Sequence, residues 1–559
     1  MANNEYEKFE KKLLNILNSS ANAKSWGDLL PTLNEILSHV RKNQKDINFS
    51  KISIKHMLAR RLAQCLNPEF PNAVHEVVLE IYKIIITNIM TNQDMRLMDN
   101  LAIYCSGLFP FFSNASLKNK EIFLKDIVEL NLLNINPDEL TLCFPGLLAA
   151  LIPGLDDNNE STTKLIYQAF EDFITKLPNI QTFFGSYWTL LLRNKHLRNS
   201  GIKYLIENII KYPDLKAKPI EEQKSFIEDY YPNINTTVVN SLIEIIKEED
   251  IPTVRNGMDF ILTRFPLVKD NDIINDEAKI NLIMNVLHLL IKNDQSVIRR
   301  LNNWLLGTVN KDDIEIDYKS DNMKYIMNLC AEAFKNIFNY ENNYSYQELL
   351  NKLTILERFS ENQPEFSNFI LSKVSYYIIK CVVNYWQIEL NCSENVQDNK
   401  IVEKVNIFFS QNKNIELLWT SMANKLKNIV EIKLGENCNQ SKSTESTETK
   451  NSNHNNGDDS YNNFLNEMND NMNPLKFCLL FIEIKTDQRK INFYFPIITH
   501  LLNIITKIKI GNRENLKDIR HIILLALVFI KSVQDTMTYS SEEIKNQLSK
   551  KMISNSSNI

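Results

Sequence analysis

Apolar residues recur at steps of three and four along most of this chain, the spacing that places them on one face of an α-helix. The stretch 58–86 shows the pattern twice in succession. Its apolar positions are Leu58, Leu62, Cys65 and Leu66, then Val74, Val77, Val78, Ile81, Ile84 and Ile85. Between the two sets, Pro68 and Pro71 each remove a backbone donor and disfavour the helical conformation for the residue before them. The stretch therefore predicts two helices that pack against each other around a tight corner.

The same pattern continues in short segments with brief connections. Predicted helices in the first part of the chain include 140–151, 162–177, 180–192, 198–210, 236–247, 254–265, 278–292 and 296–306. Local signals mark two helix starts: Asn136 before Pro137 reads as a cap with a first-turn proline, and Ser345 with Glu348 reads as a capping box. Helix pairs recur at roughly the 40 to 47 residues typical of armadillo and HEAT arrays. The sequence predicts an all-α fold, an armadillo/HEAT-like α-solenoid of stacked helical hairpins.

Changes in composition predict four regions. Residues 1–309 form a first helical-repeat domain, and residues 310–434 carry further helical repeats after a charged stretch. Residues 435–473 are rich in Asn, Ser and Thr and contain almost nothing to bury, so a disordered insertion is expected. Helical periodicity returns in residues 474–559, which predicts C-terminal helices.

Composition and charge narrow the class of protein. With 11 glycines in 559 residues the chain offers few tight turns or phosphate-binding loops, which favours helices throughout. The net charge of −5 gives no support to a general nucleic-acid binder, so we expect no nucleic-acid partner. The eight cysteines are scattered without a Cys-x-x-Cys pair, most of them among apolar residues, as expected for reduced core residues of a cytosolic protein.

The sequence also bears on membrane contact. Residues 1–9 are polar and acidic, so no signal peptide is expected there. The longest unbroken apolar run, 522–530, covers nine residues, whereas a membrane crossing needs about 20. We therefore expect any membrane contact to be peripheral.

The usual motifs for catalysis and cofactor binding are missing from the sequence. There is no Walker loop, no Gly-x-Gly-x-x-Gly and no Gly-x-Ser-x-Gly. His75 and Glu76 begin like a zincin helix, but Leu79 stands where the second histidine ligand would be. Asp156 and Asp157 could serve carboxylate chemistry or a cation site, although a solvated acidic turn is the favoured interpretation. We expect no enzyme activity, no cofactor and no metal.

One cluster of basic residues is a candidate binding site. Its members are Arg193, Lys195, His196, Arg198 and Lys203. Such a cluster can bind anionic lipid headgroups or a partner, with a solvated face as the favoured alternative. In the pairs Arg60-Arg61 and Arg299-Arg300, one arginine is expected to pack its stem between helices and to pair with a carbonyl or an acid. Trp188 and Trp304 are expected in the core.

Several blocks with uncommon residues follow one another along the first 307 residues. They are Arg60-Arg61-Leu-Ala-Gln-Cys-Leu-Asn-Pro68, Val74-His75, Leu79-Glu80-Ile-Tyr82, Ser106-Gly107-Leu-Phe-Pro110, Leu151-Ile-Pro153-Gly154-Leu155 and Asn293-Asp-Gln-Ser-Val-Ile-Arg299-Arg300-Leu-Asn-Asn-Trp304-Leu-Leu-Gly307. In this order they resemble the N-terminal domain of the Dopey family over roughly residues 10–307. The motif residues, which we expect to be structural, are Arg60, Arg61, Pro68, His75, Gly107, Pro110, Pro153, Gly154, Arg299, Arg300, Trp304 and Gly307.

The resemblance implies a non-catalytic scaffold in the cytoplasm that associates peripherally with Golgi, trans-Golgi network and endosome membranes. It implies a role in vesicle-mediated protein transport between endosomes and Golgi, with a large partner similar to Arf guanine-nucleotide exchange factors. A lipid flippase and a phosphoinositide-containing membrane are further expected partners. The alternative is a soluble helical-repeat adaptor, a cargo carrier or a translation-linked scaffold, without a membrane role. The C-terminal region of full family members is not recognised in this sequence, and the oligomeric state is open.

Overall fold

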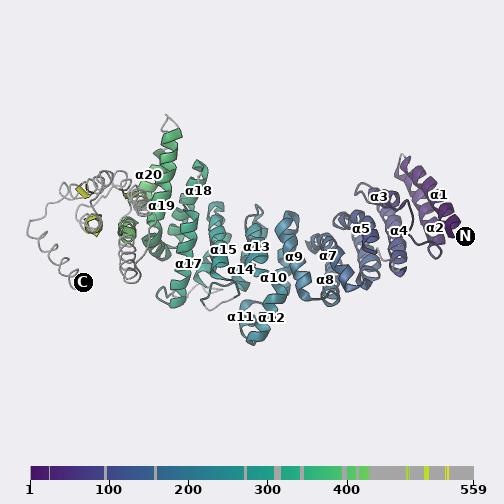
Figure 1. The fold of residues 1–559 in the computed structure, drawn as a ribbon, viewed down its shortest axis with the longest axis horizontal. Coiled ribbons are helices and arrows are strands. Elements are labelled where there is room, and N and C mark those ends of the chain that lie inside the picture. Colours follow the sequence, from purple (N-terminus) through teal and green to yellow (C-terminus); the bar gives the residue numbers. More distant parts are fainter. Residues whose placement is uncertain are drawn as a thin grey trace, which may run out of the picture. The chain divides into compact units, whose positions relative to one another are not determined.

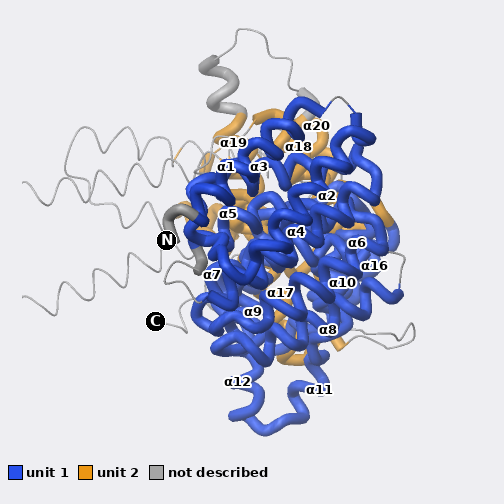
Figure 2. Tube along the Cα trace, turned by 90° about the vertical axis from the view of Figure 1, so that its right-hand side faces the viewer, with its two compact units in different colours: residues 1–286, 295–312 blue, residues 287–294, 313–559 orange. Residues whose placement is uncertain are grey.

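The computed structural model describes residues 2–23, 25–92, 97–156, 160–269, 273–307, 317–339, 345–392, 399–410 and 414–426, with isolated stretches between 474 and 527. The described residues form helices and no strand. The chain divides into two compact units, which Figure 2 distinguishes by colour: Met1–Val286 with Gln295–Asp312, and Leu287–Asp294 with Asp313–Ile559. The all-α prediction is confirmed.

Unit 1 is a stack of helix pairs in two layers (Figure 1). In the first layer each helix packs on the next, and its members are α1 (Ala2–Ala21), α3 (Lys55–Cys65), α5 (Leu97–Leu108), α7 (Pro137–Leu151), α9 (Ile180–Arg193) and α13 (Val239–Ile246). The second layer contains α2 (Trp26–Asn43), α4 (Asn72–Thr91), α6 (Leu117–Ile122), α8 (Glu160–Lys176), α10 (Arg198–Asn208), α14 (Ile251–Arg264) and α16 (Gln295–Leu306). The short helix η4 (Ile152–Asp156) contacts both α8 and α10 and so continues this layer.

Side chains join equivalent positions of neighbouring helix pairs. Arg61 donates from Nη2 to the carbonyl of Ser20, 41 residues earlier. Trp304 donates from Nε1 to the carbonyl of Phe265 at 2.8 Å, an offset of 39 residues. These offsets agree with a repeat of roughly 40 residues, so the solenoid of helical hairpins predicted from the sequence is confirmed.

Local signals in the sequence explain where several of these helices begin and end. The Asn136 side chain accepts from the Asp138 amide at 3.1 Å, and α7 begins at Pro137. Helix α5 ends just before Pro110, and the short helix η1 (Phe109–Asn114) follows it. The predicted helix 278–292 is shorter than expected: α15 (Asp276–Leu287) gives way to the 3₁₀ helix η7 (His288–Lys292), after which Asn293 adopts φ 56°. An asparagine tolerates this left-handed conformation, which ends the turn.

An insertion interrupts the regular alternation between α10 and α13. It consists of α11 (Tyr212–Lys216), α12 (Ile220–Tyr230) and the π-helical turn η6 (Ile234–Val238). Figure 2 shows α11 and α12 protruding from the body of unit 1. Because of this insertion, Ser241 of α13 donates to the carbonyl of Trp188 in α9 across 53 residues, at 2.9 Å.

Unit 2 is also built from helices. Its described elements are η7, α17 (Asp321–Ile337), α18 (Tyr346–Asn362), α19 (Pro364–Cys392) and α20 (Asn399–Phe409). The predicted capping box opens α18, since the Glu348 amide donates to Ser345 Oγ at 3.3 Å and the Ser345 amide donates to Glu348 Oε2 at 2.8 Å. Arg358 donates from Nη1 to the carbonyls of Leu290 and Ile291 at 2.6 and 3.1 Å, which fixes η7 against α18.

Two described segments correct the expectation that nothing is long enough to cross a membrane. Pro137–Asp156 and Pro364–Tyr385 are 20 and 22 residues long, and their composition is apolar enough for a span. The sequence interpretation missed them because it considered only unbroken apolar runs. The most apolar windows of the two segments are 44% and 72% buried within the protein, so the second is mostly buried, as in a core helix of a folded domain.

Two predictions lie outside the described residues. The expected disordered insertion at 435–473 is one, and almost all of the expected C-terminal helices at 474–559 are the other. The described cysteines Cys65, Cys105, Cys143, Cys330, Cys381 and Cys478 are all free thiols.

Candidate functional site

The basic cluster predicted from the sequence lies where α9 turns into α10. Asn179 caps α9 by accepting from the Thr182 amide at 2.8 Å. The helix ends at Arg193 because Asn194 adopts an extended conformation with φ −120° and ψ 102°. The short 3₁₀ helix η5 (Lys195–Leu197) then leads directly into α10. This turn places the five basic residues close together in the chain but in different environments.

Arg198 is buried, with 8% of the residue exposed. Its guanidinium donates to the carbonyls of Leu191 and Leu192, each at 3.0 Å, where the end of α9 leaves carbonyls without helical partners. It also reaches α13, donating to the Glu244 carbonyl at 3.2 Å, and it donates to Glu248 Oε1, just after that helix, at 2.6 Å. Arg198 therefore joins α9, α10 and α13 and takes no part in an exposed basic patch.

The other four residues of the cluster are exposed to different degrees. Arg193, Lys195 and His196 lie on the surface. Lys195 Nζ lies 3.4 Å from Glu248 Oε2, and Lys203 Nζ lies 2.5 Å from Asp156 Oδ1. Since carboxylates offset two of the charges locally, the structure does not assemble the five residues into one strongly positive surface. Binding of anionic lipid or a partner by the exposed members stays a prediction.

Asp156 is exposed, as the interpretation as a solvated acidic turn expects, and its carboxylate also makes structural contacts. Its carboxylate accepts from Asn199 Nδ2 at 3.1 Å and from Ser200 Oγ at 2.5 Å, besides pairing with Lys203. The three donors come from the first two turns of α10, so this carboxylate holds η4 against α10. Asp157 lies outside the described residues.

The first group of motif residues lies at contacts between α1, α3, α4 and α5. Arg61 donates to the Ser20 carbonyl of α1, whereas Arg60 is exposed. His75 Nε2 lies 2.9 Å from the Asn67 carbonyl, so it closes the corner that contains the exposed Pro68. A Cβ at Gly107 would lie 2.3 Å from the Ala63 Cβ, which shows how closely α5 approaches α3.

The second group of motif residues lies further along unit 1. Pro110 is exposed and Pro153 is half-buried, while a Cβ at Gly154 would lie 2.6 Å from Ile166 Cδ1. Arg300 donates through Nε and Nη2 to both carboxylate oxygens of Asp259, at 2.7 and 3.0 Å, whereas Arg299 is exposed. Gly307 adopts φ +67°, which favours glycine, just after α16.

A second buried arginine, missed in the sequence, repeats the arrangement of Arg198. Arg264 donates from Nη2 to the carbonyls of Ile206 and Ile209, each at 2.5 Å, and so holds the end of α10 against α14. Burial lowers the pKa of this guanidinium from its ordinary value. The burial of Arg264 could have been suspected from the sequence, because this arginine stands on an otherwise apolar helix face.

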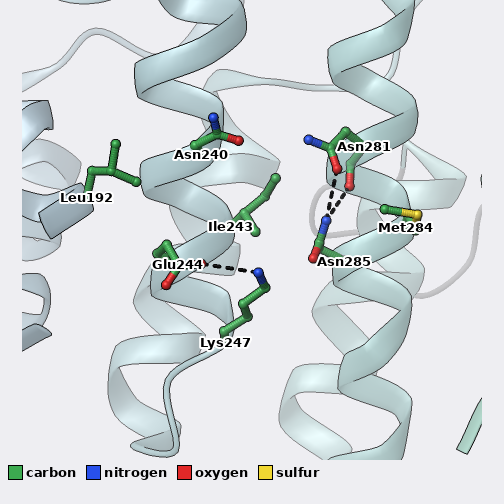
Figure 3. Close-up of a pocket in the computed structure, with 8 residues that line it drawn as sticks. All are labelled: Leu192, Asn240, Ile243, Glu244, Lys247, Asn281, Met284 and Asn285. Atoms are coloured by element: carbon green, nitrogen blue, oxygen red, sulfur yellow. Dashed lines mark hydrogen bonds and ion pairs between the residues drawn. The ribbon is translucent and has the colours of Figure 1, made fainter. Parts of the chain in front are cut away.

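A polar groove between α13 and α15 is the second feature that sequence reasoning missed. It encloses about 500 Å³, and side chains of both helices point into it (Figure 3). Three asparagines, Asn240 of α13 and Asn281 and Asn285 of α15, line the groove together with a Glu244–Lys247 ion pair. In the sequence these residues appear only as three separate asparagines: Asn281 follows Asn240 by 41 residues, and Asn285 follows Asn281 by four.

The fold and these surfaces define a HEAT/armadillo-type helical-repeat protein. In its described part, no group of three or more His, Cys, Asp or Glu side chains could hold a metal ion. The chain belongs to the Dopey family, since residues 3–310 match the family description "Dopey, N-terminal". The resemblance predicted from the motif blocks is confirmed.

Individual relatives support the same family. The chain is 25% identical over 468 residues to Protein DOP1B of Mus musculus, a match covering 75% of this chain and 19% of the mouse protein. It is 26% identical over 311 residues to the Protein DOP1 homolog of Drosophila melanogaster, covering 55% of this chain and 11% of the fly protein. With Protein DOP1 of Saccharomyces cerevisiae it shares 22% identity over 478 residues, covering 77% of this chain and 27% of the yeast protein.

The chain thus spans about a tenth to a quarter of the length of these relatives. Among solved structures, it resembles a crystal structure of importin beta with a TM-score of 0.23 and 11% sequence identity, covering 94% of this chain and 72% of that chain.

Proposed function

We propose that this protein is a non-catalytic scaffold that holds partner proteins at the surface of endosome and Golgi membranes. Membership of the Dopey family over residues 3–310 is the observation that carries the proposal. Its role would be vesicle-mediated protein transport between endosomes and Golgi, in a complex with a large Arf-exchange-factor-like partner. A stack of helix pairs suits this role because it presents long surfaces on which partners can bind side by side.

Peripheral association with cytoplasmic membrane surfaces is part of the proposal. A lipid flippase and phosphoinositide-containing membrane are the proposed further partners. The exposed Arg193 and Lys195, with His196 beside them, offer a small basic surface for anionic headgroups, and each Lys or Arg adds about 1 kcal/mol near such a membrane. Arg198 is excluded from this surface by its burial.

The non-enzymatic part of the proposal rests on the described residues. The two buried arginines bind backbone carbonyls, and the asparagine-lined groove offers carboxamides, which suit structural contacts and partner binding. Within the same residues no metal-binding group exists. A helical scaffold accounts for all of these features.

A soluble helical-repeat adaptor, either a cargo carrier or a translation-linked scaffold, is the second candidate. The observation in its favour is the local pairing of Lys195 with Glu248 and of Lys203 with Asp156. This pairing reduces the positive charge that would attract an anionic membrane. The two candidates differ in whether the protein reaches membranes at all.

Affinity purification of the tagged chain from its own cells in gentle detergent, followed by mass spectrometry and membrane fractionation, separates the two candidates. The scaffold proposal predicts the Arf-exchange-factor-like partner in the purified complex and the chain in the endosome and Golgi fractions. Soluble fractionation with unrelated partners in repeated experiments would refute it in favour of the adaptor.

Charge reversal tests the membrane surface directly. The double change Arg193→Glu and Lys195→Glu should weaken flotation of the full chain with phosphoinositide-containing vesicles several-fold at low salt. The matched control reverses two other exposed cations, Lys8 and Lys11 of α1, by the same kind of change. Equal flotation of both variants and the wild type would rule out Arg193 and Lys195 as the membrane contact.

A further inference from the structure

The groove between α13 and α15 exists because these two helices do not pack closely together. α13 packs on α9 and α14, whereas α15 makes only sparse contact with α13. The resulting space of about 500 Å³ lies within the range of roughly 300–1,000 Å³ that is typical of ligand sites. Figure 3 shows Asn240 on one side of this space, with Asn281 and Asn285 on the other.

The carboxamides in the groove have hydrogen-bonding capacity to spare. Asn240 is exposed, and among the described residues its side chain has no hydrogen-bond partner. Asn285 donates from Nδ2 to the carbonyl and to Oδ1 of Asn281, at 2.8 and 3.1 Å. This pair fixes both side chains and leaves Asn281 Nδ2 as a donor and Asn285 Oδ1 as an acceptor facing the groove.

A protein main chain matches this set of groups. Each peptide unit carries one donor and one acceptor, and a carboxamide can pair with both at once. The helix α13 has eight residues, so it is about 12 Å long, a length spanned by roughly four residues of extended chain. Ile243 and Met284 add apolar surface to the walls, where an apolar side chain of a bound segment can pack.

The charges of the groove argue against a phosphate-bearing ligand. Lys247 Nζ lies 3.2 Å from Glu244 Oε1, and Glu244 Oε2 also lies 3.4 Å from Arg198 Nη2. Lys247 is therefore paired within the groove, and no unpaired cation lines it. Nucleic acid and anionic lipid both require excess positive charge, which the lining does not provide.

We propose that the groove between α13 and α15 binds an extended, uncharged segment of a partner protein and recognises it mainly through its main chain. This inference rests on the proposed function as a scaffold and deepens it, because it gives the scaffold a defined site for a partner. Affinity comes from the asparagine carboxamides, and the apolar walls select the side chains that alternate with the main-chain contacts.

The test uses the purified full chain and a phage-displayed library of random dodecapeptides. Selection on the wild type is combined with counter-selection on the double variant Asn240→Ala/Asn281→Ala, so that only peptides that need the groove are kept. Affinities of the synthesised peptides are then measured by fluorescence anisotropy. The double variant should bind them about tenfold more weakly, since each lost carboxamide removes hydrogen bonds of modest net strength.

Matched controls separate main-chain recognition from other effects. Asn34 is an exposed asparagine of α2 whose side chain donates to the Leu30 carbonyl of its own helix, so Asn34→Ala should leave the affinity unchanged. N-methylation of alternate peptide bonds should weaken binding about tenfold, whereas alanine at the same positions should have little effect. Circular dichroism and thermal unfolding check that each variant is folded.

The proposal is overturned if no selected peptide distinguishes the wild type from the double variant, or if N-methylation has no effect on binding. These results are independent of the proposed membrane role, because the assay contains neither vesicles nor cellular partners. Loss of the Arf-exchange-factor-like partner from the purified cellular complex would refute the proposed function and leave the peptide result standing.

Discussion

Replacing Arg198 by methionine tests whether this member of the basic cluster stabilises the fold or contributes to an exposed binding surface. The change removes a guanidinium that donates to two carbonyls of α9 and to Glu248, which lies just after α13. Methionine has a similar length and can fill the space left by the arginine stem. Glu248, which is 6% exposed, would then keep a buried carboxylate without its main partner.

The magnitude follows from these contacts. Removal of one partner from a buried ion pair costs about 3–5 kcal/mol, because the remaining charge is uncompensated. Lys195 Nζ, 3.4 Å from the second Glu248 oxygen, offsets part of the loss. We therefore expect Arg198→Met to lower the free energy of unfolding of this region by about 3 kcal/mol.

Two variants control for side effects. Arg193→Met changes an exposed arginine at the end of α9, so it should alter the stability by no more than about 0.5 kcal/mol. The double variant Arg198→Met/Glu248→Met removes both charges and should recover most of the loss, because a well-packed apolar pair can replace a buried ion pair.

Hydrogen exchange of the amides in α9, α10 and α13 is the suitable assay, since it reports the opening free energy of each region separately. Urea unfolding followed by circular dichroism measures the effect on the whole chain. A loss below about 1 kcal/mol for Arg198→Met, or no recovery in the double variant, would refute the argument that this guanidinium stabilises the fold. If Arg198→Met weakens vesicle binding without loss of stability, Arg198 contributes to the exposed basic surface instead.

Three further predictions concern other contacts. Gly107→Ala should destabilise unit 1 by about 1–3 kcal/mol in urea unfolding, since its Cβ would lie 2.3 Å from the Ala63 Cβ; a neutral result would contradict the close approach of α3 and α5. Trp304→Phe should cost about 2 kcal/mol by the same assay, because the buried Phe265 carbonyl loses its donor; no change would contradict this role. Burial lowers the pKa of Lys352 to about 8, so the penalty for its charge in the folded state is fully present below pH 8 and disappears as the pH rises toward its unfolded value of about 10.4. Lys352→Met should therefore stabilise the protein by about 1 kcal/mol at pH 7, after allowance for its partial exposure, and by little near pH 10; a pH-independent gain would contradict the argument.

Local features of the fold could be predicted from the sequence because their causes are local. The Asn136 cap, the Ser345 capping box and the helix break before Pro110 each depend on residues within one turn. The helix period and the motif blocks likewise needed no knowledge of distant contacts. These local features were sufficient to predict the solenoid fold and the family.

The environment of Arg198 could not be predicted in this way. Its partner Glu248 lies 50 residues later, and the insertion of α11 and α12 between them breaks the regular period. Nothing in the sequence near Arg198 distinguishes a buried guanidinium from the exposed Arg193. The groove was missed for a related reason, because the separation of α13 from α15 is a property of packing and not of either helix alone.

The buried arginine and the groove are coupled through one side chain. Glu244 lies 3.4 Å from Arg198 Nη2 and 3.2 Å from Lys247 Nζ, and it also lines the groove. In a stack of repeats, each helix pair interacts mainly with its neighbours, so a change at Arg198 should disturb the groove next to it while leaving the distant Arg61 contact intact. The position of Glu244 therefore depends on the ion pair that joins α10 to α13. We conclude that the fold uses the positive charge at Arg198 internally, where it positions Glu244 beside the groove.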